Sequence, residues 1–319
     1  MSFLEVKNLT KNYERKKGIF TSAKKKIHAV DDVSFSMEKG ETLGLVGESG
    51  CGKSTLGRLI IRLEEPTYGK ILFDGVEITG LKGRRLRNQR CHFQIIFQDS
   101  FSSLNPRRTV GKIIEEPLSN FGIEREKRRE RVGELLMLVG LEAEHAFQYP
   151  HEFSGGQRQR INIARALALQ PELIVCDEPV SSLDVSIRAQ ILNLFRDLKK
   201  QLGLSYFFIS HDLAAVTYLS DRVAVMYLGK IVEILPTKDL ESKAYHPYTI
   251  ALLNAIMEPD PKQKTTQKQL LEGEPPDASK PPTGCRFHPR CSKAKEVCCR
   301  YEPTLKEVRK GHFVACHLS

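Results

Sequence analysis

The pattern of apolar positions predicts strands near the start of the chain. Residues 3–9 alternate between apolar and polar side chains, which predicts a half-buried strand of the kind found at a sheet edge. Strand character returns at residues 28–37, after a basic segment, residues 14–26, that we expect to interrupt the sheet. The segment at residues 41–46 is short and apolar enough to predict a buried strand.

Helical periodicity dominates two later regions. Apolar residues at i, i+3, i+4 and i+7 follow the buried strand and predict an amphipathic helix: Leu56, Leu59, Ile60 and Leu63. Residues 109–149 contain no strand pattern and predict an inserted helical subdomain. Its clearest apolar stripe consists of Val132, Leu135, Leu136 and Val139.

Strand and helix patterns then alternate to the end of the main domain. Apolar strands are predicted at residues 70–75, 92–98, 173–177 and 204–210, and a pair of short strands within 221–235 turns at Gly229. Between the strands at 173–177 and 204–210 we predict a helix whose apolar face is formed by Ile187, Ile191, Leu194 and Leu198. This alternation implies a parallel α/β sheet covered by helices on both faces.

Composition changes after Met257. Residues 258–284 hold six prolines and many polar residues, which predicts a linker with little to bury. A small Cys-rich segment follows. We therefore predict a main domain at 1–257 with a helical subdomain at about 99–160, a linker at 258–284 and a Cys-rich module at 285–319.

The overall composition is that of an ordinary soluble globular protein, with 40% hydrophobic and 28% charged residues. No apolar run approaches the roughly 18 residues needed to span a bilayer, and no signal-peptide pattern opens the chain. We expect a cytosolic or peripheral protein. The net charge of +10 is spread along the sequence and is best explained by a solvated surface.

A phosphate-binding motif lies between the buried strand and the amphipathic helix. Its pattern, G-x-x-x-x-G-K-S, is that of a P-loop, whose glycines let backbone N–H groups surround a polyphosphate at a helix N-terminus. Lys53 supplies positive charge to the β- and γ-phosphates, and the Ser54 hydroxyl is a hard ligand for Mg²⁺. The predicted nucleotide-binding residues are Gly47, Glu48, Ser49, Gly50, Cys51, Gly52, Lys53, Ser54 and Thr55.

Two carboxylates end the apolar strand at residues 173–177. Beside a P-loop, we expect Asp177 to hold the Mg²⁺ shell and Glu178 to act as general base on the water that attacks the γ-phosphate. A strand that ends in carboxylates is weak evidence alone, and it becomes strong in combination with the P-loop.

The segment Ser154-Gly-Gly-Gln157 lies between these two motifs in the chain, just before a predicted helix at residues 161–169. It resembles the signature of ABC-type ATPases. Further motifs follow in the order that this family shows. Gln98 resembles the Q-loop glutamine, which would contact both metal and water, and residues 182–184 resemble the D-loop. His211 resembles the switch histidine, and Tyr13 resembles the aromatic residue that stacks on adenine. The resemblance covers residues 3–257.

The resemblance implies a fold and a mechanism. The fold would be a RecA-like parallel sheet core with an antiparallel β subdomain and an inserted helical subdomain. Two ATPase domains would pack head to tail, so that each ATP lies between the P-loop of one and the signature of the other. The residues that would act from across this interface are Ser154, Gly155, Gly156, Gln157 and Asp184.

A closer resemblance narrows the class. The segments at residues 98–110 and 245–249 are similar to those of ATP-binding subunits of oligopeptide, dipeptide and nickel importers, and most similar to the second of the two such subunits. This implies an ATPase at the cytoplasmic face of the membrane. Its partners would be a second ATPase subunit, identical or different, two transmembrane permeases and an extracytoplasmic solute-binding protein. The cargo stays open among dipeptides, oligopeptides, nickel and oligosaccharides.

Five of the eight cysteines crowd the last 35 residues, where metal binding is a better explanation than disulfides in a chain without an export signal. The tail resembles that of the same importers, in which four cysteines hold a [4Fe–4S] cluster, with Zn²⁺ as the alternative. Cys299 could replace Cys298 as a ligand. The predicted ligands are Cys285, Cys291, Cys298 and Cys316.

The sequence also permits a second class of function. The positive charge permits a soluble ABC-type ATPase that acts on nucleic acid or ribosomes. Such proteins usually carry two cassettes or a long coiled-coil insertion, and this sequence has neither. We therefore expect an ATP-hydrolysing transport subunit with no nucleic-acid partner.

Overall fold

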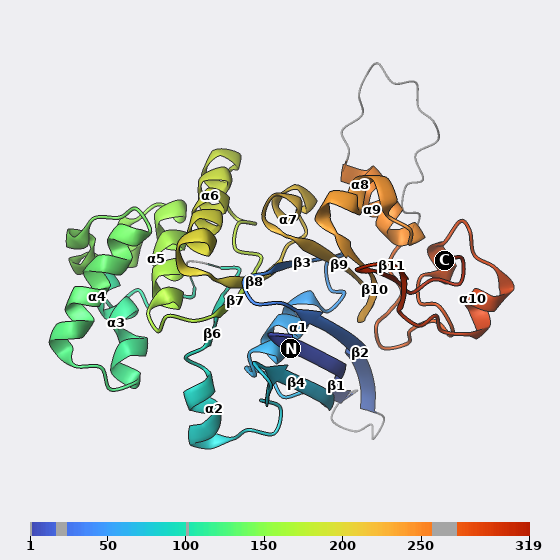
Figure 1. The fold of residues 1–319 in the computed structure, drawn as a ribbon, viewed down its shortest axis with the longest axis horizontal. Coiled ribbons are helices and arrows are strands. Elements are labelled where there is room, and N and C mark those ends of the chain that lie inside the picture. The colour runs from blue at the N-terminus through green and yellow to red at the C-terminus, as the bar shows by residue number, and fades with distance from the viewer. Residues whose placement is uncertain (1, 17–23, 100–101, 257–272) are drawn as a thin grey trace, which may run out of the picture. The chain divides into compact units, whose positions relative to one another are not determined.

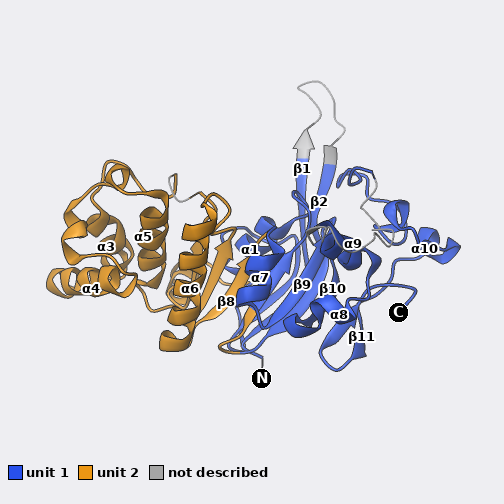
Figure 2. Ribbon diagram, turned by 90° about the horizontal axis from the view of Figure 1, so that it is seen from above, with its two compact units in different colours: residues 1–38, 43–79, 211–319 blue, residues 39–42, 80–210 orange. Residues whose placement is uncertain are grey.

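The computed structural model describes residues 2–16, 24–99, 102–256 and 273–319 (Figure 1). The chain divides into two compact units (Figure 2). The first combines residues 1–38, 43–79 and 211–319, and the second combines residues 39–42 and 80–210. Among the described helices, none is long and apolar enough to cross a membrane.

The first unit contains a four-stranded antiparallel sheet in the order β2-β1-β4-β5. Its strands are β1 (Leu4–Lys16), β2 (Lys24–Met37), β4 (Tyr68–Phe73) and β5 (Val76–Glu77). The expected edge position of the first strand is wrong, because β1 pairs with both β2 and β4. Alternation reports that one face is buried and does not report how many neighbours a strand has. The expected interruption of the sheet at residues 14–26 is shorter in the structure, because β1 continues to Lys16 and β2 begins at Lys24. Residues 17–23 lie outside the described residues.

A second sheet in this unit carries the P-loop. Strand β3 (Thr42–Val46), buried along its whole length, runs parallel to β9 (Arg222–Tyr227). Strand β10 (Lys230–Pro236) pairs antiparallel with β9, and the turn between them has positive φ at Leu228 and Gly229, 44° and 84°. The predicted strand pair and its turn are confirmed. The helices of this unit's main part are α1 (Lys53–Ile60), α7 (Leu213–Leu219), α8 (Leu240–Lys243) and α9 (Pro247–Ile256).

The C-terminal segment continues the same sheet. Strand β12 (His312–Val314) pairs with β10, and β11 (Lys306–Arg309) pairs with β12. Between the linker and β11 lies the short helix α10 (Glu296–Arg300). A separate Cys-rich module is therefore not supported: the segment belongs to the first unit through backbone hydrogen bonds. Residues 258–272 of the predicted linker lie outside the described residues.

The second unit contains three parallel strands in the order β8-β7-β6: β8 (Ser205–Ile209), β7 (Leu173–Asp177) and β6 (Phe93–Ile96). Helices α3 (Val110–Asn120), α4 (Arg125–Leu138) and α5 (Gly155–Leu167) pack together beside them (Figure 1). The remaining helices are α2 (Gly83–Gln89) and α6 (Val185–Leu202). The predicted apolar stripe of the helical region is buried: Val132, Leu135, Leu136 and Val139.

Two helical stripes differ in detail from the prediction. Helix α1 ends at Ile60, so Leu63 lies beyond it and is 48% exposed. In α6 the buried face is Ile191, Leu192, Phe195 and Leu198. Adjacent apolar residues on a helix compete for the buried face, and tertiary packing decides between them.

Candidate functional site

The P-loop leaves β3 and enters α1 through a space that only glycine fits. Gly47 and Gly52 have φ of 155° and 109°. A Cβ atom on Gly52 would lie 2.0 Å from the carbonyl oxygen of Ala29, and one on Gly47 would lie 2.1 Å from that of Met226. The loop therefore passes close to the backbones of β2 and β9, which explains two of the motif glycines.

Lys53, the first residue of α1, folds back over the loop. Its ammonium group donates hydrogen bonds to the carbonyl oxygens of Gly47, at 2.8 Å, and Glu48, at 2.9 Å. The side chain is buried, 5% exposed, so these contacts replace lost hydration. The arrangement holds a fixed positive charge at a helix N-terminus, where an anion is favoured.

Three residues that are remote in the chain hold the P-loop through hydrogen bonds. The Glu48 N–H donates to the Tyr248 hydroxyl at 2.9 Å, and the Gly229 N–H donates to the Cys51 carbonyl at 2.8 Å. The Glu48 carboxylate accepts hydrogen bonds from both terminal nitrogens of Arg290, at 2.8 and 3.0 Å. Burial raises the pKa of Tyr248 well above its usual value, so its hydroxyl stays protonated. Sequence reasoning assigned no role to Tyr248 or Arg290.

Tyr13 lies beside the start of α1. Its hydroxyl contacts the Glu64 carboxylate and the Thr55 hydroxyl, and the Lys11 ammonium lies 5.1 Å from its ring centroid. Burial and the Glu64 contact raise the pKa of Tyr13. The structure thus brings Tyr13 together with Thr55 of the P-loop, which suits the predicted role at adenine. That role stays a prediction.

In the second unit, Gln98 and Glu178 meet. The Gln98 side-chain amide donates to the Glu178 carboxylate at 3.0 Å, while Asp177 at the end of β7 is only 3% exposed. Glu178 has a φ of 49°, unusual for a residue other than glycine, and its N–H donates to the Ile209 carbonyl at 2.9 Å. Such strained backbone is frequent at functional sites, where it aims a side chain.

The signature segment forms the N-terminus of α5. Ser154 is the N-cap, its hydroxyl accepts from the Gln157 N–H at 3.3 Å, and the Gln157 side chain accepts from the Ser154 N–H at 3.0 Å. This reciprocal capping box starts the helix at Gly155, six residues before the helix that the sequence predicted. A Cβ atom on Gly156 would lie 2.5 Å from Ile187 of α6.

Two further predicted site residues lie at helix starts. Asp184 caps α6 by accepting from the Ile187 N–H at 3.0 Å, a hydrogen bond that lowers the pKa of its carboxyl. His211 is exposed and follows β8, directly before Asp212, which caps α7.

The C-terminal thiols lie near one another. Burial raises the pKa of the Cys285 thiol to about 11, and the Cys298, Cys316 and Cys291 thiols add to the increase. Cys299 is exposed. Within the described ranges, however, no three His, Cys, Asp or Glu side chains are placed to hold a metal ion. The eight cysteines, all in described segments, form no disulfide.

A buried polar network supports α9. Glu233 is fully buried and accepts hydrogen bonds from the Tyr245 N–H at 2.7 Å and the His246 N–H at 3.1 Å. The His312 ring nitrogen lies 2.7 Å from the same carboxylate. The Tyr248 N–H donates to Nδ1 of His246 at 3.1 Å, so the imidazole acts there as an acceptor. The network fixes the tyrosine that holds Glu48.

His246 makes stability depend on pH. Burial lowers the pKa of its imidazole from 6.5 to about 4. The unfolded chain therefore binds a proton at higher pH than the folded chain does, and the free energy of unfolding falls as pH falls through this window. Denaturant unfolding should show a loss of about 2 kcal/mol from this group between about pH 7.5 and about pH 5.

His246→Asn keeps an acceptor near the Nδ1 position and should remove that part of the pH slope. His151→Asn, at an exposed position, is the matched control and should keep the wild-type slope. An unchanged slope in His246→Asn would contradict the assignment.

The family model "ABC transporter" matches residues 30–181, and "Oligopeptide/dipeptide transporter, C-terminal region" matches residues 232–298. The oligopeptide transport ATP-binding protein AppF of Bacillus subtilis is 51% identical, with 99% of this chain and 97% of that protein covered. A putative peptide import ATP-binding protein of Brucella ovis is 52% identical, with 98% and 96% covered. The chain therefore belongs to the family of ABC transporter ATPases.

Solved structures agree with this assignment. The ATP-binding cassette MJ0796, solved as a dimer in a post-hydrolysis state bound to ADP and phosphate, has a TM-score of 0.65. It is 29% identical, and the match covers 73% of this chain and 98% of that one. The fold is therefore an ABC ATPase cassette with mixed sheets.

Proposed function

We propose that this chain is the ATP-hydrolysing subunit that energises peptide import by an ABC transporter. The hydrogen bond of 3.0 Å between Gln98 and Glu178 carries the proposal, because it couples the general base to the segment that leads into the helical subdomain. The names of relatives that match almost the whole chain, AppF among them, support peptides as the cargo.

Within this proposal, each site residue has a role. The loop N–H groups and Lys53 bind the β- and γ-phosphates, and Glu178 takes a proton from the attacking water. Gln98 orients that water, His211 contacts the γ-phosphate, and Tyr13 stacks on adenine. The Ser54 hydroxyl, the Asp177 carboxylate and the Gln98 amide oxygen are the hard donors that Mg²⁺ prefers, and this ion neutralises phosphate charge when bound.

The site is completed by a second chain. The start of α5 offers the Ser154 hydroxyl and the backbone amides of a helix N-terminus, and we infer that they bind the γ-phosphate of ATP held by a partner's P-loop. Gly155, Gly156 and Gln157 belong to the same contact, with Asp184 beside it. The partner is a second ATPase subunit, identical or different.

The wider assembly follows from the same family membership. Two transmembrane permeases and an extracytoplasmic solute-binding protein would complete the transporter, with this subunit peripheral at the cytoplasmic face. The relatives found do not favour an ATPase of nucleic acid or ribosomes, since their names specify peptide transport.

Reconstitution tests the proposal. Proteoliposomes that contain this chain, its partner ATPase and the permeases should hydrolyse ATP several-fold faster when solute-binding protein and peptide are added together. In parallel samples, nickel or oligosaccharide replaces the peptide and tests these alternative cargoes. Stimulation by RNA or ribosomes, with none by any solute, would contradict the proposal.

A second proposal concerns the C-terminal cysteines, which were predicted to bind an iron–sulfur cluster. Cys285, Cys291, Cys298 and Cys316 are near neighbours, but within the described ranges they do not form a set of side chains placed to hold a metal ion. We therefore derive no step through a cluster. A [4Fe–4S] cluster, or Zn²⁺ instead, stays a prediction that metal and sulfide analysis of anaerobically purified protein decides.

A further inference from the structure

Two arginines of the C-terminal segment lie four residues apart: Arg286 precedes the short helical turn His288–Arg290, and Arg290 is its last residue. The side chains of Arg286 and Arg290 are only 8% and 6% exposed. A guanidinium so deeply buried needs several polar partners. In both cases these partners belong to the P-loop or to the segments that touch it.

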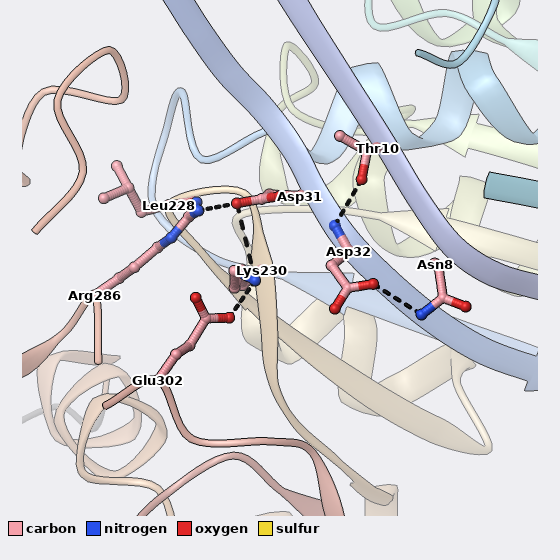
Figure 3. Close-up of polar contacts among 8 residues, drawn as sticks. All are labelled: Asn8, Thr10, Asp31, Asp32, Leu228, Lys230, Arg286 and Glu302. Atoms are coloured by element: carbon pink, nitrogen blue, oxygen red, sulfur yellow. Dashed lines mark hydrogen bonds and ion pairs between the residues drawn. The ribbon is translucent and has the colours of Figure 1, made fainter. Parts of the chain in front are cut away.

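Arg286 holds the turn that contacts the loop. Its guanidinium donates to the Asp31 carboxylate and to the Leu228 carbonyl (Figure 3). The Asp31 N–H donates to the Gly229 carbonyl at 2.9 Å, and the Gly229 N–H donates to Cys51 of the P-loop at 2.8 Å. A continuous path of hydrogen bonds therefore joins Arg286 to the loop.

A neighbouring ion pair gives Asp31 a second cationic partner and also reaches the C-terminal segment. The Lys230 ammonium contacts the Glu302 carboxylate and lies 3.8 Å from that of Asp31 (Figure 3). Asp31 is thus shared by two cations, one from the C-terminal segment and one from β10. This sharing anchors residues 286–302 to the sheet that carries the P-loop.

Arg290 contacts the loop directly. Its two terminal nitrogens form a bidentate pair with the Glu48 carboxylate, the strongest geometry for such a pair. The guanidinium lies 5.9 Å from the Tyr227 ring centroid, and Tyr227 packs against Tyr248 and Phe287, with ring centroids at 4.7 and 5.2 Å. The packed rings leave the arginine little freedom to move away from Glu48.

We propose that residues 284–291 brace the phosphate-binding loop, and that Arg290 is a positioning residue for nucleotide binding that acts through Glu48. The inference rests on the proposed phosphate-binding role of the loop. Two physical effects support it. The brace orders the loop before ATP arrives, which lowers the entropic cost of binding. The guanidinium also neutralises a carboxylate that would otherwise repel the phosphates.

The test is MgATP affinity of the full chain, by titration calorimetry, together with kcat and KM. Arg290→Gln is expected to raise Kd and KM roughly three- to thirty-fold, within the range of coupling between residues in contact, and to change kcat less than about twofold. Arg290→Lys keeps the charge and loses the bidentate geometry, so an intermediate Kd is expected.

Glu48→Gln removes the charge that Arg290 neutralises. The double variant with Arg290→Gln should therefore match Glu48→Gln alone, and multiplying effects would overturn the route through Glu48. Arg300→Gln, at an exposed position in the same segment, is the control and should bind like wild type.

Lys53→Ala separates this inference from the function on which it rests. Loss of ATP binding in Lys53→Ala with wild-type affinity in Arg290→Gln would overturn the brace alone. Wild-type affinity in Lys53→Ala would overturn the role of the loop and the brace with it. Where Arg290→Gln fails to fold, a folded Arg290→Lys with raised Kd supports the brace, and a folded Arg290→Lys with wild-type Kd overturns it.

Discussion

Glu178→Gln is expected to lower ATP turnover by about 100-fold or more, the usual contribution of a general base. Glutamine keeps the size of the side chain and a polar contact for the Gln98 amide, so the geometry of the pair is preserved. The glutamine side chain, however, cannot accept a proton from water at neutral pH. ATP binding should remain, and ATP-bound dimers should accumulate because the complex no longer breaks down.

Steady-state phosphate release measures the loss, and size-exclusion chromatography with MgATP measures the accumulation of dimers. Glu126→Gln, on the exposed face of α4, is the matched control and should leave both unchanged. Full turnover in Glu178→Gln would show that another group activates the water.

Gly52→Ala should abolish detectable ATP binding. Its Cβ atom would lie 2.0 Å from the Ala29 carbonyl oxygen, in a backbone with φ of 109°. The Met226 side chain, at 2.9 Å, can rotate aside, but the Ala29 backbone cannot. The loop must therefore shift away from β2, and its N–H groups lose their common orientation. We expect at least about a hundredfold loss of affinity, the loss typical when positioned donors are displaced by an ångström.

Gly40→Ala provides the matched control for this change. Gly40 also has positive φ, 76°, but nothing lies within 4 Å of the added Cβ atom. That variant should lose a little stability, about 1–2 kcal/mol, and keep its ATP affinity. Titration with MgATP and thermal unfolding distinguish the two outcomes, and wild-type affinity in Gly52→Ala would contradict the assigned loop geometry.

Much of the local structure could be predicted from the sequence. Strand β7 has the predicted bounds, Leu173–Asp177, because four consecutive apolar residues before two carboxylates leave few alternatives. The turn at Gly229 was predicted for a similar local reason. The start of α5 was placed too late, although the Ser154–Gln157 capping box is itself a local signal.

Other features depend on partners that are remote in the chain. The alternation in β1 shows which face is buried, and it contains no information on whether one or two strands lie alongside. The C-terminal segment was predicted as a separate module because its composition changes abruptly. Three residues of β12 were enough to join it to the sheet through β10.

The sequence alone determined the chemistry of this protein: a P-loop, two carboxylates after a buried strand, and a capped signature helix each depend on residues that are close in the chain. Only the tertiary structure decided that Arg290 reaches Glu48, 242 residues away, and that Tyr248 accepts the Glu48 N–H. The physical reason is that a motif encodes backbone conformation locally, whereas a buried ion pair requires two distant segments to pack first. No spacing or periodicity in the sequence records such a pair.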